Sequence, residues 1–162
     1  MNTLQYAINM EHDGEKYYRG QAEINKNNEL QVVCNLLADE EKIHGEILES
    51  KKNKLAYKLI DLDLLSNAKN MFTSAPDIDA QEKRDSSQLA FYRIAADMEK
   101  KSIELYQQFL ADATDADEKE LCKYLIKQEK QHYELFDEMG RLLTNAENWI
   151  ESPEFGRREE EF

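Results

Sequence analysis

Hydrophobic side chains recur every three or four residues in four long stretches of the chain. This spacing places them on one face of an α-helix. The stretches span residues 4–26, 30–50, 87–110 and 118–143. We therefore predict four amphipathic helices, each with one buried face.

The lengths of the connections indicate how these helices are arranged. An Asn-rich stretch at 25–28 separates the first two helices, and residues 111–117 separate the last two. Residues 55–86 form a much longer connection, with a short amphipathic piece near Leu59 to Leu65 and a break at Pro76. Two short loops and one long connection predict an all-α, ferritin-like four-helix bundle with a long crossover between helices 2 and 3. We expect residues 1–144 to form the bundle, and residues 145–162 to form a tail with one turn around Trp149.

Residues that favour helix N-termini precede the third and fourth stretches. Asp85, Ser86 and Ser87 are the candidate caps of the third helix, and the candidates for the fourth are Thr114, Asp115 and Asp117.

Composition narrows the class of protein. The 162 residues suit one domain, and the net charge of −13 argues against nucleic acid or an anionic membrane as a partner. No apolar run is long enough to cross a membrane, and the first residues do not resemble a signal peptide, so we expect a cytoplasmic protein. Cys34 and Cys122 are too few for a disulfide scaffold or a four-cysteine metal site, and we expect buried thiols.

The two helix pairs are related by an internal repeat. A shift of 88 positions aligns identical residues in both helices of each half. The aligned pairs are Ala7 with Ala95, Met10 with Met98, Glu11 with Glu99, Tyr18 with Tyr106, Cys34 with Cys122, Leu37 with Leu125, Glu41 with Glu129 and His44 with His132. The sequence therefore predicts two copies of a helix pair related by an approximate two-fold axis.

Some of the repeated residues are unusual for a helical core. Glu11 lies seven residues from both Leu4 and Tyr18, so the three side chains share a face. Glu41 follows Leu37 by four residues, and the second half repeats the pattern. Six side chains are thus expected at one level of the bundle interior, namely Glu11, Glu41, His44, Glu99, Glu129 and His132.

Four ionised carboxylates in a core repel one another and lose their hydration, at a cost of several kcal/mol per charge. No Lys or Arg lies on the inward faces at that level. Two divalent cations would balance the four negative charges, so charge arithmetic favours a dinuclear metal site. Carboxylates and neutral imidazoles suit iron, with manganese as an alternative.

The chain resembles the ferritin-like superfamily of di-iron carboxylate proteins, and within it the rubrerythrin type. The resemblance extends over about residues 3–144, and its carriers are the segments at 7–11, 37–44, 96–99 and 128–132, with Tyr106. It implies that Glu41 and Glu129 bridge two iron ions. It also implies that Glu11 with His44, and Glu99 with His132, are the terminal ligands.

The resemblance further implies that the metal pair reacts with hydrogen peroxide or dioxygen, and that the protein is a homodimer. Rubrerythrins usually carry another Glu three residues after the third-helix ligand, where this chain has Ser102. The four-cysteine rubredoxin domain of that family is absent from these 162 residues. Electrons would therefore come from an external donor such as a rubredoxin-like protein.

Several neighbouring residues have alternative interpretations. Tyr18 and Tyr106 either pack in the core or donate hydrogen bonds to ligand carboxylates, where they would be candidate catalytic groups. Glu40 and Gln128 each precede an expected bridging Glu, and each is a candidate to accept the free ring N–H of the opposite half's histidine. His12 lacks the spacing of a ligand and is expected to face solvent.

Three functions fit these residues. The first is an oxidoreductase that reduces peroxide or dioxygen. The second is an iron-handling protein of the ferroxidase type, which oxidises and sequesters iron without turnover. The third is a folded interaction or structural protein whose metal site is vestigial.

Overall fold

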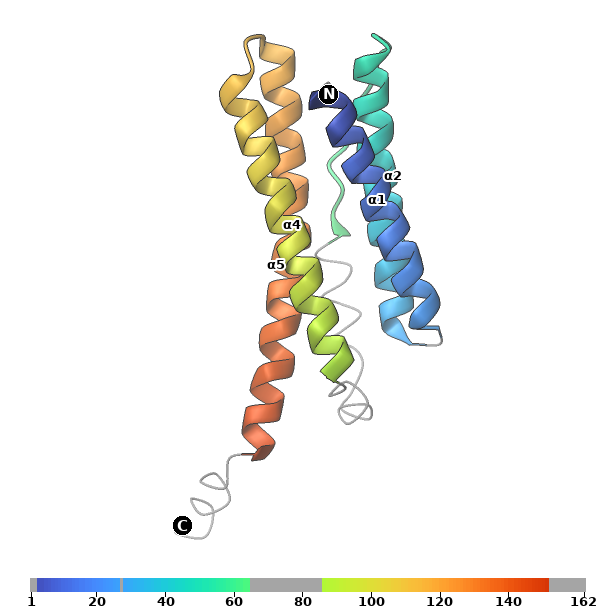
Figure 1. Ribbon diagram of the computed structural model, residues 1–162, viewed down its shortest axis with the longest axis vertical. Helices are drawn as coiled ribbons and strands as arrows, with labels where there is room; N and C mark the ends of the chain where they lie inside the picture. The colour runs from blue at the N-terminus through green and yellow to red at the C-terminus, as the bar shows by residue number, and fades with distance from the viewer. Residues whose placement is uncertain (1–2, 27, 65–85, 152–162) are drawn as a thin grey trace.

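The computed structural model describes residues 3–26, 28–64 and 86–151 of the chain. These residues form four helices: α1 (Thr3–Ile24), α2 (Glu29–Lys52), α4 (Ser86–Asp112) and α5 (Ala116–Glu151). Figure 1 shows two helix pairs side by side, with the long connection between α2 and α4. The prediction of an all-α four-helix protein with a long crossover is confirmed, and the arrangement is consistent with a ferritin-like bundle.

Two of the helices, α2 and α5, are capped at their N-terminal ends by a polar side chain. The Asn28 Oδ1 accepts a hydrogen bond from the Leu30 backbone N–H at 2.9 Å. The Asp115 Oδ1 accepts from the Glu118 backbone N–H at 2.7 Å, so Asp115 is the cap among the three candidates for the fourth helix. α4 begins at Ser86, and the candidate Asp85 lies outside the described residues.

The last helix is longer than the hydrophobic pattern predicts. α5 continues past Leu143 to Glu151, so the expected end at Leu143 is wrong. The reason is that residues 144–151 contain neither Gly nor Pro, and the first proline after Leu143 is Pro153. The division into a bundle, 1–144, and a tail, 145–162, stays a prediction.

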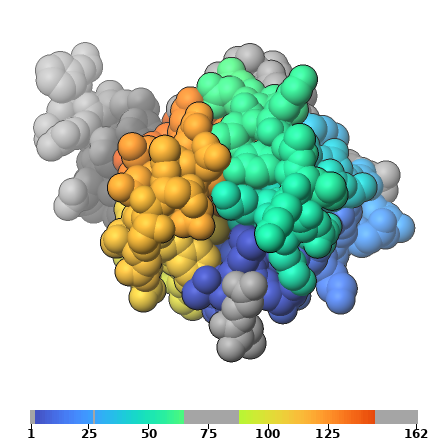
Figure 2. All heavy atoms as spheres, turned by 90° about the horizontal axis from the view of Figure 1, so that it is seen from above, coloured from blue at the N-terminus to red at the C-terminus, as the bar shows by residue number. Residues whose placement is uncertain are grey.

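The first part of the crossover lies along α5. Residues 55–63 have no regular secondary structure, while Leu64 is buried. The Tyr124 hydroxyl donates to the Ile60 carbonyl at 2.7 Å, and the Lys127 Nζ lies 3.0 Å from both carboxylate oxygens of Asp61. Figure 2, seen from above, shows this segment (green) against the start of α5 (orange). The crossover therefore covers part of the α5 surface near the middle of the bundle.

The helices pack mainly as α1 with α2 and α4 with α5. On each helix, the buried apolar residues fall into two clusters, one toward either end. One cluster includes Tyr18, Tyr92 and Phe136, and the other includes Ile8 and Leu125. A band of buried polar side chains separates the clusters on all four helices. Among the described residues, no helix is sufficiently long and apolar to span a membrane.

Candidate metal centre

The polar band contains all six side chains expected at one level of the interior. Each of them is at most 5% exposed. α1 supplies Glu11, α2 supplies Glu41 and His44, α4 supplies Glu99, and α5 supplies Glu129 and His132. The structure thus brings together one Glu from each of two helices and a Glu-x-x-His pair from each of the other two.

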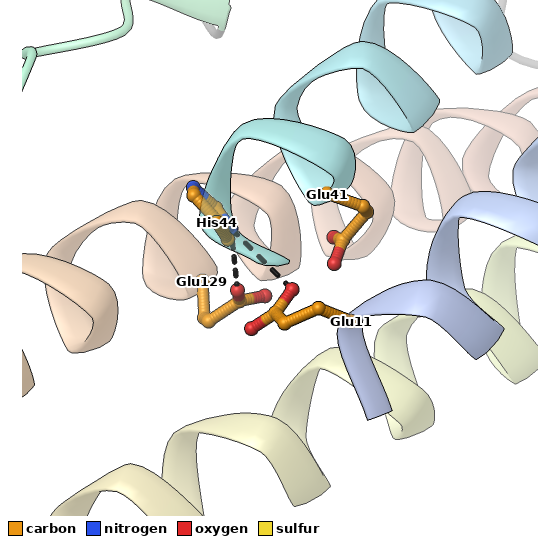
Figure 3. A group of neighbouring side chains, drawn as sticks. All are labelled: Glu11, Glu41, His44 and Glu129. Atoms are coloured by element: carbon orange, nitrogen blue, oxygen red, sulfur yellow. Dashed lines mark ion pairs between the residues drawn. The ribbon is translucent and has the colours of Figure 1, made fainter. Parts of the chain in front are cut away.

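These six residues form two overlapping groups whose potential ligand atoms lie within 4.8 Å of one another. The first group is Glu11, Glu41, His44 and Glu129, drawn in Figure 3. The second group is Glu41, Glu99, Glu129 and His132. Glu41 and Glu129 belong to both groups, so the two positions adjoin and share two carboxylates. The clusters fit a dinuclear metal site.

Both histidines turn the Nδ1 atom toward the carboxylates. The His44 Nδ1 lies 3.1 Å from the Glu129 Oε1 and 3.5 Å from the Glu11 Oε2. The His132 Nδ1 lies 3.2 Å from the Glu41 Oε1 and 3.6 Å from the Glu99 Oε1. The two rings lie nearly parallel, with their centroids 5.8 Å apart.

Many of these buried atoms have no hydrogen-bond partner within the described part of the chain. They are the Glu11 Oε2, both carboxylate oxygens of Glu129, both ring nitrogens of His44 and the His132 Nδ1. The short distances from Nδ1 to the carboxylates place opposite charges close together, but without hydrogen-bond geometry. Buried polar atoms normally have partners, and a concentration of unpaired oxygen and nitrogen atoms is what metal ligands present. The donor set therefore fits a pair of metal cations.

The protein groups alone strongly perturb one another's ionisation. Burial, with repulsion from Glu129, Glu11 and Glu99, raises the pKa of Glu41 well above its usual range. Burial and the nearby Glu129 raise the pKa of Glu99 to about 8. Burial opposes the charged form of His44, but attraction to the carboxylates of Glu11 and Glu129 outweighs burial and raises the pKa of His44 to about 10. Without a cation, the site therefore retains protons at neutral pH, and a bound cation would displace them.

Glu129 differs from the other carboxylates. Burial favours its neutral form, but the close approach of Glu99, His132 and His44 outweighs burial and holds the pKa of Glu129 well below the usual range. Glu129 is thus the carboxylate that the surrounding groups stabilise most strongly as an anion.

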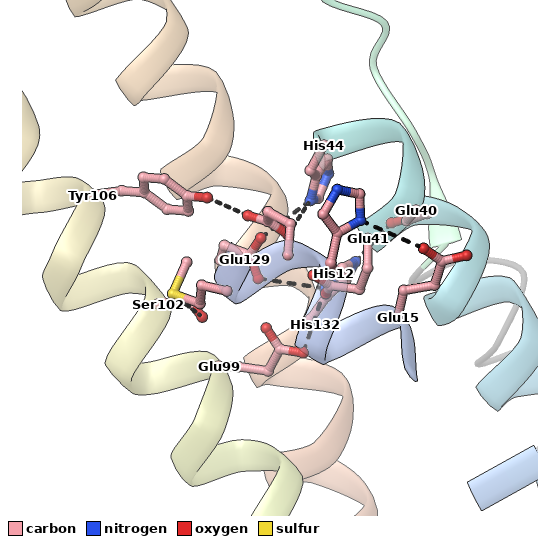
Figure 4. Close-up of polar contacts among 12 residues, drawn as sticks. His12, Glu15, Glu40, Glu41, His44, Glu99, Ser102, Tyr106, Glu129 and His132 are labelled. Carbon is pink, nitrogen blue, oxygen red and sulfur yellow. Dashed lines mark hydrogen bonds and ion pairs between the residues drawn. The ribbon is translucent and has the colours of Figure 1, made fainter. Parts of the chain in front are cut away.

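Two buried tyrosines join the halves of the bundle at the site. The Tyr18 hydroxyl on α1 donates to Glu99 on α4, and the Tyr106 hydroxyl on α4 donates to Glu11 on α1. Burial and the nearby carboxylates raise the pKa of both phenols well above the usual value, so the hydroxyls remain protonated donors. Each tyrosine therefore both packs in the core and positions a carboxylate of the opposite pair, and Figure 4 shows Tyr106 turned toward the site.

The two residues that precede the shared carboxylates differ. The Glu40 Oε2 lies 2.6 Å from the His132 Nε2, as the sequence suggests for that half. The equivalent contact between Gln128 and His44 is not formed, because the Gln128 Oε1 and the His44 Nε2 both lack hydrogen-bond partners among the described residues.

Three further expectations concern residues outside the two groups. His12 is exposed as expected, and its Nε2 lies 2.7 Å from the Glu49 Oε1. Cys34 and Cys122 are buried free thiols, as predicted.

A pocket of about 440 Å³ between α1 and α4 reaches the carboxylates, and we did not predict it from the sequence. Its lining includes Met10, Gly14, Tyr18, Glu41, Met98, Glu99 and Ser102. The Ser102 hydroxyl lies 3.2 Å from the Met98 carbonyl and 3.6 Å from the Met10 sulfur. The repeat contains a signal for this pocket, since the 88-residue shift pairs Gly14 with Ser102 and so places small residues on both walls.

The comparisons with known proteins agree with this geometry. The family model described as Rubrerythrin matches residues 2–140, which is most of the chain. No curated protein and no solved structure gives a significant match. The match includes all six residues of the two clusters. The chain therefore belongs to the rubrerythrin family.

Proposed function

We propose that this protein is a di-iron oxidoreductase that reduces hydrogen peroxide or dioxygen with electrons from a separate donor protein. One observation carries the proposal: two buried carboxylate and histidine clusters share Glu41 and Glu129. Membership of the rubrerythrin family supports it. A rubredoxin-like protein suits the role of donor, because two cysteines cannot supply a four-cysteine iron site within these 162 residues.

In this proposal, Glu41 and Glu129 bridge two iron ions. Glu11 with His44 would bind one ion, and Glu99 with His132 the other. The membership of the two groups supports this division, because each group contains one unshared Glu and one His. Manganese has similar ligand preferences and is the alternative metal. When bound, an iron pair supplies two electrons as it changes from di-iron(II) to di-iron(III).

The chain itself contributes access, orientation and hydrogen bonds. The pocket between α1 and α4 has a volume of about 440 Å³, which is large enough to hold a diatomic molecule or peroxide, and Glu41 and Glu99 are among its lining residues. Tyr18 lines this pocket and also donates to Glu99, so it fixes a carboxylate beside the entry route. On the other side of the bundle, the crossover covers α5 next to Gln128. We therefore place the entry of the oxidant on the α1 and α4 side.

An anaerobic titration tests the proposal. Protein loaded with iron(II) is supplied with a chemical reductant and successive additions of peroxide. An oxidoreductase consumes many equivalents of peroxide per protein, whereas an iron-handling protein gives one stoichiometric burst and then stops. A burst without turnover would contradict the proposed activity and favour the ferroxidase-type alternative.

A matched pair of variants connects the activity to the site. Glu129→Gln keeps the shape of a buried shared residue but removes its charge, and we expect it to abolish turnover and lower the iron content. Glu134→Gln makes the same change five residues later at an exposed position on α5 and should behave as wild type. Equal turnover in the two variants would contradict the assignment of the site.

A further inference from the structure

The 88-residue repeat is broken at one position beside the metal site. The residue that precedes the shared Glu41 is Glu40, whereas the residue that precedes the shared Glu129 is Gln128. Both side chains are buried, with Glu40 8% and Gln128 0% exposed. One half therefore offers a carboxylate at a position where the other half offers an amide.

Glu40 contacts the histidine of the opposite half. The distance of 2.6 Å between the Glu40 Oε2 and the His132 Nε2 is that of a charge-assisted hydrogen bond in which the ring N–H donates. In the neutral ring, this bond fixes the tautomer, because it keeps the proton on Nε2 and leaves the Nδ1 lone pair on the side of Glu41 and Glu99. The buried Glu40 carboxylate thus fixes the orientation in which the His132 Nδ1 faces the carboxylates of the site.

His44 lacks such a partner. Its Nε2 has no hydrogen bond among the described residues, and the edge-on neighbour of its ring is Tyr124, with centroids 6.1 Å apart. The Gln128 Nε2 instead lies 3.5 Å from the Asp61 Oδ1 in the crossover, and the charge of Asp61 is balanced by Lys127. On its Nε2 side, His44 therefore lacks the carboxylate partner that His132 has in Glu40.

A carboxylate that accepts the free N–H of a ligating imidazole makes the imidazole a stronger donor to the metal. Loss of such a partner typically lowers metal affinity by about 10- to 100-fold. We propose that Glu40 makes the two metal positions unequal, so that the position bounded by Glu99 and His132 binds a divalent cation more tightly than the position bounded by Glu11 and His44. Glu40 is then a positioning residue that acts through His132. This inference rests on the proposed metal pair but not on the identity of the oxidant.

The test is an anaerobic calorimetric titration of metal-free protein with iron(II), combined with Mössbauer spectra of ⁵⁷Fe at one and two equivalents. We expect two binding steps whose constants differ by about 10-fold or more. At one equivalent, a single iron environment should dominate the spectrum, and a second should appear at two equivalents. His132→Gln should remove the tighter step, and His44→Gln the weaker one.

Exchange variants separate this role from a purely structural one. Glu40→Gln should weaken the tighter step by about 10-fold or more and leave the weaker step nearly unchanged. Gln128→Glu should strengthen the weaker step. The double variant, with the amide and carboxylate exchanged, should restore two unequal steps with the order of the positions reversed. Glu46→Gln, at an exposed position on the same helix as Glu40, is the matched control.

Each contrary result has a separate meaning. Two steps in the wild-type protein that differ only by the statistical factor would contradict the inequality but leave the metal pair intact. An equal weakening of both steps by Glu40→Gln, with no effect of Gln128→Glu, would show that Glu40 only supports the fold. A wild-type protein that binds no pair of ions would contradict the proposed metal centre itself.

Discussion

Gly14 on α1 provides a way to move one shared carboxylate without changing any charge. A Cβ atom at position 14 would lie 3.0 Å from the Glu41 Oε2, 3.3 Å from its Cδ and 3.5 Å from its Cγ. Gly14→Ala therefore requires the buried Glu41 to shift by a few tenths of an ångström. Gly20, on the same helix, has no atom within 4 Å of its added Cβ, so Gly20→Ala is the matched control.

The gain in stability from replacing glycine by alanine in a helix is the same for both variants. Alanine in place of glycine in a helix interior is worth about 0.8–1.0 kcal/mol. For a chain of this size, each kcal/mol changes the Tm by about 2–4 °C. In metal-free protein, we expect Gly20→Ala to raise the Tm by about this amount and Gly14→Ala to raise it by no more.

The loss of stabilisation by bound metal is expected for Gly14→Ala alone. Glu41 belongs to both ligand groups, so its displacement should lower metal affinity by about tenfold or more. Each tenfold loss removes about 1.4 kcal/mol of the stabilisation that saturating metal provides. This loss exceeds the helix gain. Iron(II)-loaded Gly14→Ala should therefore melt below the loaded wild type, and loaded Gly20→Ala above it.

Differential scanning calorimetry measures both effects on stability. The wild type, Gly14→Ala and Gly20→Ala are compared without metal and with saturating iron(II) under anaerobic conditions. The decisive quantity is the increase in Tm on metal loading, which should be smaller for Gly14→Ala than for the other two proteins. If metal loading raised the Tm of all three proteins equally, the assignment of Glu41 as a shared ligand would be wrong.

Three other predictions concern the hydrogen bond of Tyr106, the ionisation of Glu99 and the pocket beside Ser102. Tyr106→Phe removes a hydrogen bond to the buried Glu11 and should destabilise the metal-free protein by about 1–3 kcal/mol in urea denaturation; an effect no larger than that of Tyr6→Phe, at an exposed position, would contradict the prediction. The pKa of Glu99 is raised from 4.5 to about 8, so between these values the folded metal-free protein retains a proton that the unfolded chain has lost. Its Tm should therefore fall as the pH rises from about 4.5 to about 8, and a rising Tm would contradict the raised pKa of Glu99. Ser102→Leu should narrow the pocket between α1 and α4. In stopped-flow measurements, we expect slower oxidation of the iron(II) protein by peroxide and an unchanged iron content. Equal rates for Ser102→Leu and Ser102→Ala would exclude this pocket as the route by which peroxide enters.

Much of the fold and the site could be predicted from the sequence, because the patterns that indicate them either lie within a single helix or recur in both halves of the chain. The period of hydrophobic residues located the helices, and their spacing relative to Glu11 and Glu41 placed the carboxylates on buried faces. The constant shift of 88 residues then put the two halves at the same level. The buried thiols of Cys34 and Cys122 followed from the same periodicity.

Other features depend on tertiary contacts that no local pattern encodes. The sequence left open whether Tyr18 and Tyr106 pack or donate, because the answer depends on how the two helix pairs face one another. The repeat suggested equivalent contacts for Glu40 and Gln128, but an amide in contact with the crossover does not reproduce the bond that a carboxylate makes. The path of residues 55–63 along α5 is likewise set by a hydrogen bond to Tyr124 and an ion pair with Lys127, both distant in the sequence.

The most direct test of a metal pair bound by Glu41 and Glu129 is a crystal structure of the iron(II)-loaded protein with anomalous diffraction measured at the iron absorption edge. We expect two anomalous peaks about 3.5–4 Å apart in the bundle interior, both in contact with the carboxylates of Glu41 and Glu129. A single peak, peaks confined to the acidic surface, or no peak between the four helices would contradict it.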